Sequence, residues 1–348
     1  MITTDEIMRD AREKEASDIH ITEGMPMRYR IHGTLQESRL QAEDGETRAL
    51  LCGMLDEGQL AALEGGADID FAVTSSDGQC QRVNIFRQQG KLAATIRLLN
   101  GRIPTAEELQ LPRIVTELAK EPRGLILVTG PTGSGKSTTL AAMVEHINRT
   151  RSAHIITIED PVEYVYECRQ ALIHQREVGR DVAGFAPALR SALREDPDII
   201  LVGEMRDFET ISAALTAAET GHLVLSTLHT TGAAQTIDRI IDACPGEREN
   251  QVRAQLVGVL KGIVTQCLIP RVDGCSRMAA TEILLGTDAA LNLMREGKTY
   301  QLPNIMQTAG GGMHTLNMDL QRLIQLGYIS REEACKYTNN RKEFEQFL

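Results

Sequence analysis

The chain of 348 residues contains no tryptophan, and aromatic residues make up only 3% of it. Because single-stranded nucleic acids bind largely by stacking on aromatic side chains, this scarcity argues against a base-stacking surface. The net charge of −11 at pH 7 does not favour a surface that coats nucleic acid, although it leaves room for a local basic groove. Apolar residues at 42% and charged residues at 24% indicate a globular protein.

Long apolar runs and paired cysteines are also missing. No apolar run approaches the roughly 20 residues that a membrane-spanning helix needs. The start of the chain is polar from Thr3 to Asp10, which does not fit a signal peptide. The seven cysteines are scattered and never form C-x-x-C, which suits reduced thiols and argues against structural zinc. These absences together predict a cytoplasmic protein.

One segment carries a specific chemical signal. Residues Gly130-Pro131-Thr132-Gly133-Ser134-Gly135-Lys136-Ser137 match the pattern G-x-x-x-x-G-K-[ST]. The apolar, β-branched run 125–129 before them predicts a buried parallel strand. The residues after them predict a helix by their i, i+3, i+4, i+7 spacing; these are Leu140, Met143, Val144 and Ile147. A glycine-rich turn between a strand and a helix points backbone N–H groups into one concavity, which binds phosphate.

The pattern also predicts individual roles within this phosphate loop. Lys136 should reach the β and γ phosphates, and the hydroxyl of Ser137 should bind Mg²⁺. Thr138 completes the predicted nucleotide-binding set, residues 130–138. The alternative is a chance match in a glycine-containing turn, and the strand and helix on either side count against it.

The pattern of the first hundred residues is typical of a small α+β domain. Thr3 and Glu6 fit a capping box for a first helix. Alternating apolar residues predict a hairpin over 19–31, followed by strands over 70–73 and 82–98. We predict that this domain covers residues 1–100. Gly101, Pro104 and Pro112 then bracket a predicted linker over 101–112.

The remainder of the chain changes to alternating strands and helices. Buried strands are predicted at 125–129, 155–158, 199–202 and 223–225, with amphipathic helices between them. This βαβ rhythm predicts a core over 113–270, built on a parallel sheet with helices on both faces. After about Arg271 the pattern becomes mostly helical, so residues 271–348 are predicted to form a helical C-terminal region. The fold class is therefore α/β.

Carboxylates follow two of the predicted strands. Glu204 comes shortly after the strand 199–202, where it could hold Mg²⁺ through water or orient the attacking water. Glu159, Asp160 and Glu163 follow the strand 155–158, and strand ends beside a phosphate loop face the ligand crevice. One of these could act as a general base. The alternatives are a surface glutamate in the first case and a solvated acidic turn in the second.

Histidines and arginines supply further candidates. His222 and His229 flank the strand 223–228, and their spacing does not suit zinc. A histidine at a strand's carboxyl end could sense the γ phosphate, although a purely structural role is equally compatible. Arg82 and Arg97 lie in the first domain. Phosphoryl transfer gains from a guanidinium donated by another subunit, but each could simply be a solvated strand arginine.

Together these motifs resemble the secretion-ATPase superfamily, most closely the type IV pilus retraction ATPases (PilT family). The stretches that carry the resemblance are Ser17-Asp18-Ile19-His20, Arg82-Val83-Asn84-Ile85-Phe86, Ile158 to Glu163, Leu193 to Asp207, and Gly221 to Thr230. Residues 292–298 resemble the family's C-terminal A-I-R-N-L-I-R-E motif, with Ala290 and Leu291 where Ile and Arg are expected.

The resemblance implies a PAS-like first domain and a RecA-like P-loop ATPase domain with a helical C-terminal region. It implies ATP and Mg²⁺ as cofactors, Glu204 and Glu163 as the working carboxylates, and His229 as the phosphate sensor. The resemblance also implies that Arg82 and Arg97 are arginine fingers, which reach the nucleotide site of a neighbouring subunit. Ser137 would hold Mg²⁺ directly, and Glu204 would hold it through water.

The same resemblance implies a hexameric motor that hydrolyses ATP to drive pilus retraction and twitching motility. Its partners would be the inner-membrane platform protein of the pilus and a paralogous retraction ATPase, with no nucleic acid expected. It would be cytoplasmic and peripheral to the inner membrane at the pilus base. The alternatives are a pilus-assembly or type II secretion motor, a scaffold subunit that does not hydrolyse ATP, and a nucleic-acid translocase.

Overall fold

The structure, a computed structural model, describes residues 2–31, 33–42, 45–76, 79–98, 102–274, 276–341 and 344. It separates the chain into two compact units, Met1–Arg102 with Asp160–Val165, and Ile103–Glu159 with Tyr166–Leu348. The predicted boundary at residues 100 and 101 lies outside the described residues, as does Cys275. The limits predicted at residues 112 and 270 stay predictions.

The first unit combines a six-stranded sheet with three helices among its described residues. Its elements are α1 (Thr4–Glu13), β1 (Ala16–Thr22), β2 (Met25–Ile31), β3 (Thr34–Glu37), α2 (Glu46–Cys52), α3 (Glu57–Glu64), β4 (Ile69–Thr74), β5 (Cys80–Gln88) and β6 (Lys91–Leu98). The strand order is β3-β2-β1-β6-β5-β4, and each neighbouring pair is antiparallel.

Helix α1 shows how the local sequence builds this unit. Its predicted capping box is present, because Thr3 Oγ1 accepts from the Glu6 amide and the Glu6 carboxylate accepts from the Thr3 amide. Ile7 and Met8 are buried against the sheet in one apolar core with residues such as Ile19. Strand side chains alternate between faces, so the polar residues between the buried ones lie together on the other face of the sheet.

The second unit carries the phosphate loop. Its strands are β7 (Gly124–Thr129), β8 (His154–Glu159), β9 (Leu172–Glu177), β10 (Ile199–Val202), β11 (Leu223–Leu228), β12 (Leu260–Pro270) and β13 (Arg277–Leu285). Its helices are α4 (Arg113–Leu118), α5 (Lys136–Thr150), α6 (Phe185–Ala192), α7 (Phe208–Glu219), α8 (Ala233–Asp242), η1 (Gly246–Arg248), α9 (Glu249–Val259), α10 (Asp288–Arg295), η2 (Thr299–Gln301), α11 (Leu302–Thr308), α12 (Leu316–Gln325) and α13 (Arg331–Tyr337).

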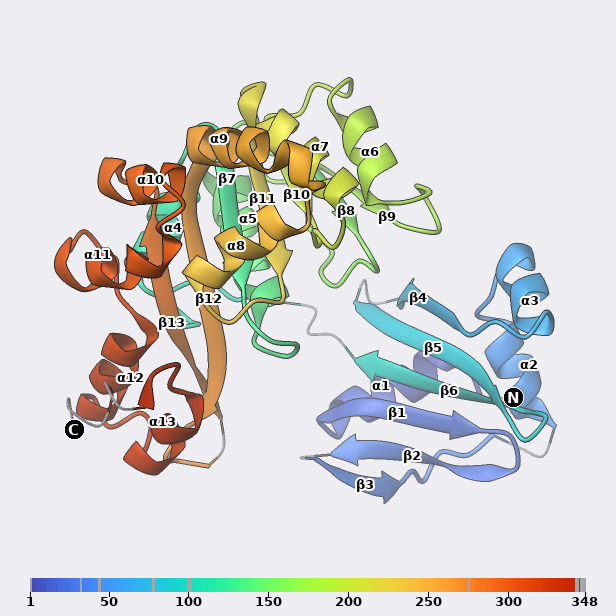
Figure 1. Cartoon of the computed structure of the whole chain (residues 1–348). Coiled ribbons are helices and arrows are strands. Elements are labelled where there is room, and N and C mark those ends of the chain that lie inside the picture. The colour runs from blue at the N-terminus through green and yellow to red at the C-terminus, as the bar shows by residue number, and fades with distance from the viewer. Residues whose placement is uncertain are drawn as a thin grey trace. The chain divides into compact units, whose positions relative to one another are not determined.

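The second sheet has the strand order β13-β12-β7-β11-β10-β8-β9 (Figure 1). The strands from β12 to β9 run parallel, whereas β13 is antiparallel to β12. Leu125 and Leu127 of β7 pack into a core that includes α6 to α9. Ile126 and Val128 pack into the opposite core with α4 and α5. The predicted α/β sheet with helices on both faces is therefore confirmed.

The described part of the region predicted to be mostly helical contains one strand. The nine-residue strand β13 pairs along β12, from Gly262 opposite Leu285 to Pro270 opposite Arg277. Its sequence includes Ala279, Ala280 and Glu282, which are poor strand formers. Strand pairing and burial against α12 and α13 override this local preference, since β-propensity depends strongly on tertiary context.

Candidate nucleotide site

The phosphate loop joins β7 to α5, as predicted. Gly130 and Gly135 have φ values of 142° and 88°, in the region that favours glycine. At Gly130 the backbone also comes so close to β12 that a methyl group would lie 2.2 Å from the backbone oxygen of Gln266. The loop therefore requires glycine at Gly130 for two independent reasons.

Lys136 begins α5 and turns back over the loop. Its Nζ donates to the carbonyl oxygens of Gly130 and Pro131 at 2.9 and 3.0 Å. The side chain is largely buried, with 9% of the residue exposed. The ammonium group thus sits over the start of the loop, where the pattern places the phosphates.

The carboxyl edge of the sheet brings Glu204 and His229 together. Thr129 at the end of β7 pairs with Leu228 at the end of β11, so the phosphate loop and His229 leave the sheet side by side. His229 Nε2 lies 3.3 Å from Glu204 Oε2, and Arg206 forms an ion pair with Glu204 Oε1. Glu204 is 9% exposed. Its carboxylate is therefore held from two sides, and it follows β10, which β11 separates from the strand that carries the loop.

The three further candidates Glu159, Glu163 and His222 lie at different places in the fold. Glu159 ends β8, and its Oε1 accepts from Thr157 Oγ1 at 2.7 Å and from Gln175 Nε2 at 3.2 Å. Glu163 lies in the segment 160–165, which groups with the first unit. His222 lies at the amino end of β11, where its Nδ1 contacts the Ala217 carbonyl oxygen at 2.9 Å. That is the far end of the strand from His229, so His222 has a structural role.

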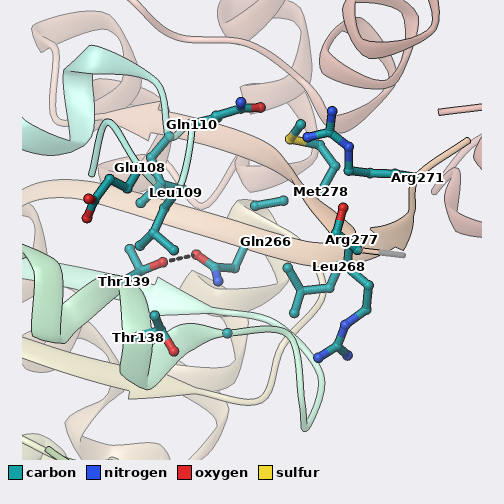
Figure 2. Close-up of a pocket in the computed structure, with 14 residues that line it drawn as sticks. Glu108, Leu109, Gln110, Thr138, Thr139, Gln266, Leu268, Arg271, Arg277 and Met278 are labelled. Carbon is teal, nitrogen blue, oxygen red and sulfur yellow. Dashed lines mark hydrogen bonds between the residues drawn. The ribbon is translucent and has the colours of Figure 1, made fainter. Parts of the chain in front are cut away.

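A cavity of about 290 Å³ adjoins the phosphate loop (Figure 2). Thr138 and Thr139 at the start of α5 line one side, and Leu268 and Met278 of β12 and β13 line another. This volume is near the lower end for small-molecule pockets, and apolar walls with a few polar groups are typical of them. Sequence patterns did not predict this cavity, because its walls come from separate segments, 108–111, 135–139, 266–271 and 276–279.

The two predicted arginine fingers are direct cross-strand neighbours in the first unit. Arg82 of β5 pairs with Arg97 of β6, which in turn pairs with Asp18 of β1. Arg97 Nε donates to Asp18 Oδ1 at 3.0 Å, and Arg82 Nε donates to Asp70 Oδ1 at 3.1 Å. The hydrogen bond that Asp70 accepts raises the pKa of Arg82. Each guanidinium is anchored by a carboxylate, and 64% of the Arg97 side chain is exposed.

Glu282 of β13 is a buried carboxylate that sequence reasoning missed. Its Oε1 accepts from the Ala233 amide of α8 at 2.8 Å, and its Oε2 accepts from the Leu316 amide of α12 at 3.4 Å. It thus caps two helices, one of which follows the loop that carries His229. Burial raises the pKa of Glu282. A charged residue within an apolar run was the only signal for it in the sequence.

The donor atoms available suit a hard cation. Ser137 offers a hydroxyl and Glu204 a carboxylate, and oxygen ligands of this kind are those that Mg²⁺ prefers. Over the described ranges, no group of three or more His, Cys, Asp and Glu side chains could hold a metal alone. The residues therefore fit a metal that takes most of its ligands from nucleotide oxygens and water.

Comparison with known proteins places this site in a family. Residues 83–336 match the family described as Type II/IV secretion system protein. The chain is 47% identical over 331 residues to the type IV pilus retraction ATPase PilT of Pseudomonas aeruginosa, covering 94% of this chain and 96% of that protein. The chain belongs to this secretion-ATPase family.

Two further members of the secretion-ATPase family are similar over most of their length. The twitching motility protein of Neisseria gonorrhoeae is 45% identical over 313 residues, covering 89% of this chain and 84% of that protein. The solved structure of the pilus retraction motor PilT with bound ADP is 44% identical, with a TM-score of 0.93, and covers 99% of this chain and 100% of that one. These relatives confirm the predicted resemblance, the ATPase fold and a P-loop motor ATPase of pilus retraction. No helix among the described residues is long and apolar enough to span a membrane.

Proposed function

We propose that this motor binds ATP with Mg²⁺ along the carboxyl edge of the second sheet. The phosphates would lie in the loop 130–138, and Ser137 would hold the metal, which would neutralise phosphate charge. The purine would enter the cavity beside the loop. The observation that carries this proposal is that the loop, Glu204 with His229, and the cavity all gather around the ends of β7, β10, β11 and β12.

Glu204 is the carboxylate that we assign to water activation and to water-mediated metal binding. Its contacts with Arg206 and His229 fix the direction of the carboxylate before substrate arrives. Preorganised groups of this kind lower the reorganisation needed in the transition state. His229 contacts Glu204 and would also hydrogen-bond the γ phosphate, so it would link phosphate state to the position of Glu204. Glu163 is the second carboxylate that we assign to the site.

We assign Arg82 and Arg97 to the active site of a neighbouring subunit in a homohexamer. They lie side by side on one face of the first sheet, each held by a carboxylate, and 64% of the Arg97 side chain is exposed. In phosphoryl transfer a guanidinium supplied in trans stabilises the charge that develops on the transferred phosphate. Arg97 donates to Asp18 through Nε, and a guanidinium carries further N–H donors on its terminal nitrogens that would serve a phosphate.

The same arrangement suggests how hydrolysis produces movement. Because the fingers belong to the first unit, engagement with a neighbour's nucleotide would fix that unit's orientation. The linker 101–112 would absorb the change, as short connecting segments do in domain closure. The motor would act on the inner-membrane platform protein from the cytoplasmic side and remove pilin subunits from the base of the fibre. A paralogous retraction ATPase would work beside it.

The shared site can be tested by mixing two inactive variants. Arg97→Ala and Lys136→Ala chains should each hydrolyse ATP poorly alone. Mixed rings should regain turnover, because an intact finger from one chain meets an intact loop in the next. Arg28→Ala serves as the matched control, since it removes an exposed arginine of the same sheet, and it should keep its activity. If rings shown to contain both variants recover no turnover, the fingers do not act in trans.

A further inference from the structure

Gln266 of β12 contacts the phosphate loop at two places and α5 at a third, although it belongs to no motif described above. Its side chain donates from Nε2 to the Ser134 carbonyl oxygen at 2.6 Å. At Oε1 it accepts from Thr139 Oγ1 at 2.9 Å, the bond drawn in Figure 2. Its backbone oxygen packs against Gly130. The residue is 2% exposed, so water does not compete for these bonds.

The orientation of the Gln266 amide is determined by its partners. A carbonyl oxygen can only accept, so the NH₂ end must face Ser134. The opposite end then accepts from the hydroxyl of Thr139, which is itself 2% exposed. The Ser134 carbonyl therefore specifies the orientation of the amide, and the Thr139 hydroxyl, which can donate or accept, donates to Oε1 in that orientation, so every bond is made.

The bond to Ser134 also sets the direction of a backbone N–H in the loop. The peptide between Ser134 and Gly135 is trans, so its C=O and N–H groups point in opposite directions. With the carbonyl held toward β12, the N–H of Gly135 points away from β12. A phosphate loop works by aiming such N–H groups at the phosphates.

Glycine makes this peptide easy to misorient. Gly135 has no side chain to bar the flipped conformation, in which the carbonyl would point into the loop and the N–H away from it. A carbonyl oxygen facing a phosphate would repel it and would remove one donor. The loop therefore needs an external group that selects one orientation.

We propose that Gln266 is a positioning residue for ATP binding, which holds the Ser134–Gly135 peptide with its N–H directed at the phosphates. It touches no phosphate itself and acts on the phosphates through this peptide. Thr139 supports it by fixing the amide. The inference depends on nucleotide binding at the loop and not on the arginine fingers or on hexamer formation.

The test measures ADP affinity and steady-state ATP hydrolysis in three variants. Gln266→Met keeps an unbranched side chain of similar length but removes the donor and the acceptor. Thr139→Val removes only the hydroxyl that orients the amide, and Thr139→Ser restores it. A hydrogen bond to a charged group contributes enough that its loss corresponds to about a 10- to 100-fold change in affinity.

The Q266M variant should bind ADP about 10- to 100-fold more weakly and show a raised KM with little change in kcat, because the lost donor acts equally on bound substrate and transition state. T139V should show a smaller loss, and T139S should be close to wild type. Partial unfolding should not contribute to these losses of affinity, because the assays are run well below the thermal midpoint of each variant without nucleotide.

Wild-type ADP affinity in folded Q266M overturns the proposal. If Q266M does not fold, the comparison of T139V with T139S tests the proposal instead. Equal ADP affinities in these two variants would then overturn the proposal. A fall in thermal midpoint with unchanged KM and ADP affinity would show a packing role only, which also contradicts the inference.

Discussion

Replacing Gly130 by alanine tests the close approach of the phosphate loop to β12. The added methyl group would lie 2.2 Å from the backbone oxygen of Gln266 and 2.6 Å from Ser134 Oγ. Real side-chain carbons do not approach backbone oxygen so closely. Strand β12 cannot easily move away from β7, because Thr265 pairs with Thr129 across the two strands and their hydroxyl groups hydrogen-bond at 2.8 Å. The clash must therefore be relieved by moving one strand or the loop.

Gly133 provides the matched control within the same loop. Its φ of 77° also favours glycine, but a methyl group there would meet no heavy atom of the described residues within 4 Å. Both variants suffer backbone strain of about 1–3 kcal/mol. Only G130A adds overpacking, which typically costs about 1–3 kcal/mol. For a unit of this size, each kcal/mol lowers the thermal midpoint by about 2–4 °C.

We therefore expect G130A to unfold about 2–12 °C below G133A in a thermal melt without nucleotide, or to fail to fold when G133A folds. Circular dichroism or scanning calorimetry on the purified full chain measures this difference. Equal midpoints for the two variants would refute the contact between Gly130 and β12, and with it the geometry on which the role of Gln266 depends.

Two further predictions concern buried carboxylates. The E204Q variant should bind ATP normally and hydrolyse it about 10²- to 10⁴-fold more slowly, because general acid–base groups contribute a factor of that size. The control variant Glu209→Gln, which changes an exposed carboxylate, should keep its activity. Equal losses of ATP binding and turnover in E204Q would contradict the assignment. Burial raises the pKa of Glu282 from its usual value near 4.5, so the folded chain holds this proton more tightly than the unfolded chain, and stability falls as the pH rises above that value. The side chain of the E282Q variant cannot ionise, so the thermal midpoint of E282Q minus that of wild type should increase between about pH 4 and pH 7. A constant or decreasing difference would show that the folded protein stabilises the charged carboxylate.

Local patterns in the sequence predicted a large part of this structure. The capping box at Thr3 and Glu6, the strand before the phosphate loop and the helix after it are all set by residues within a few positions of one another. Glu204 and His229 were also predicted as strand-end residues. Their 3.3 Å contact follows from adjacent parallel strands that end at one edge of a sheet.

The features that were missed depend on contacts between distant segments. Gln266 and Thr139 are 127 positions apart, and nothing local marks either one. The pairing of Arg82 with Arg97 depends on strand register, which the sequence leaves open. Strand β13 was missed because its alanines favour helix, whereas the neighbouring strand supplies the pairing that decides its conformation.

Strand β7 has apolar cores on both of its faces, and this limits how the motor can change shape. Its side chains alternate between the two cores, so sliding or tilting the strand would open close-packed interiors on both sides at once. The base of the phosphate loop is consequently a fixed point throughout the ATPase cycle. Displacements of mechanical use must arise outside this strand, in the loops that leave the sheet edge and in the predicted linker 101–112, and the central strand serves as the stationary frame against which they move.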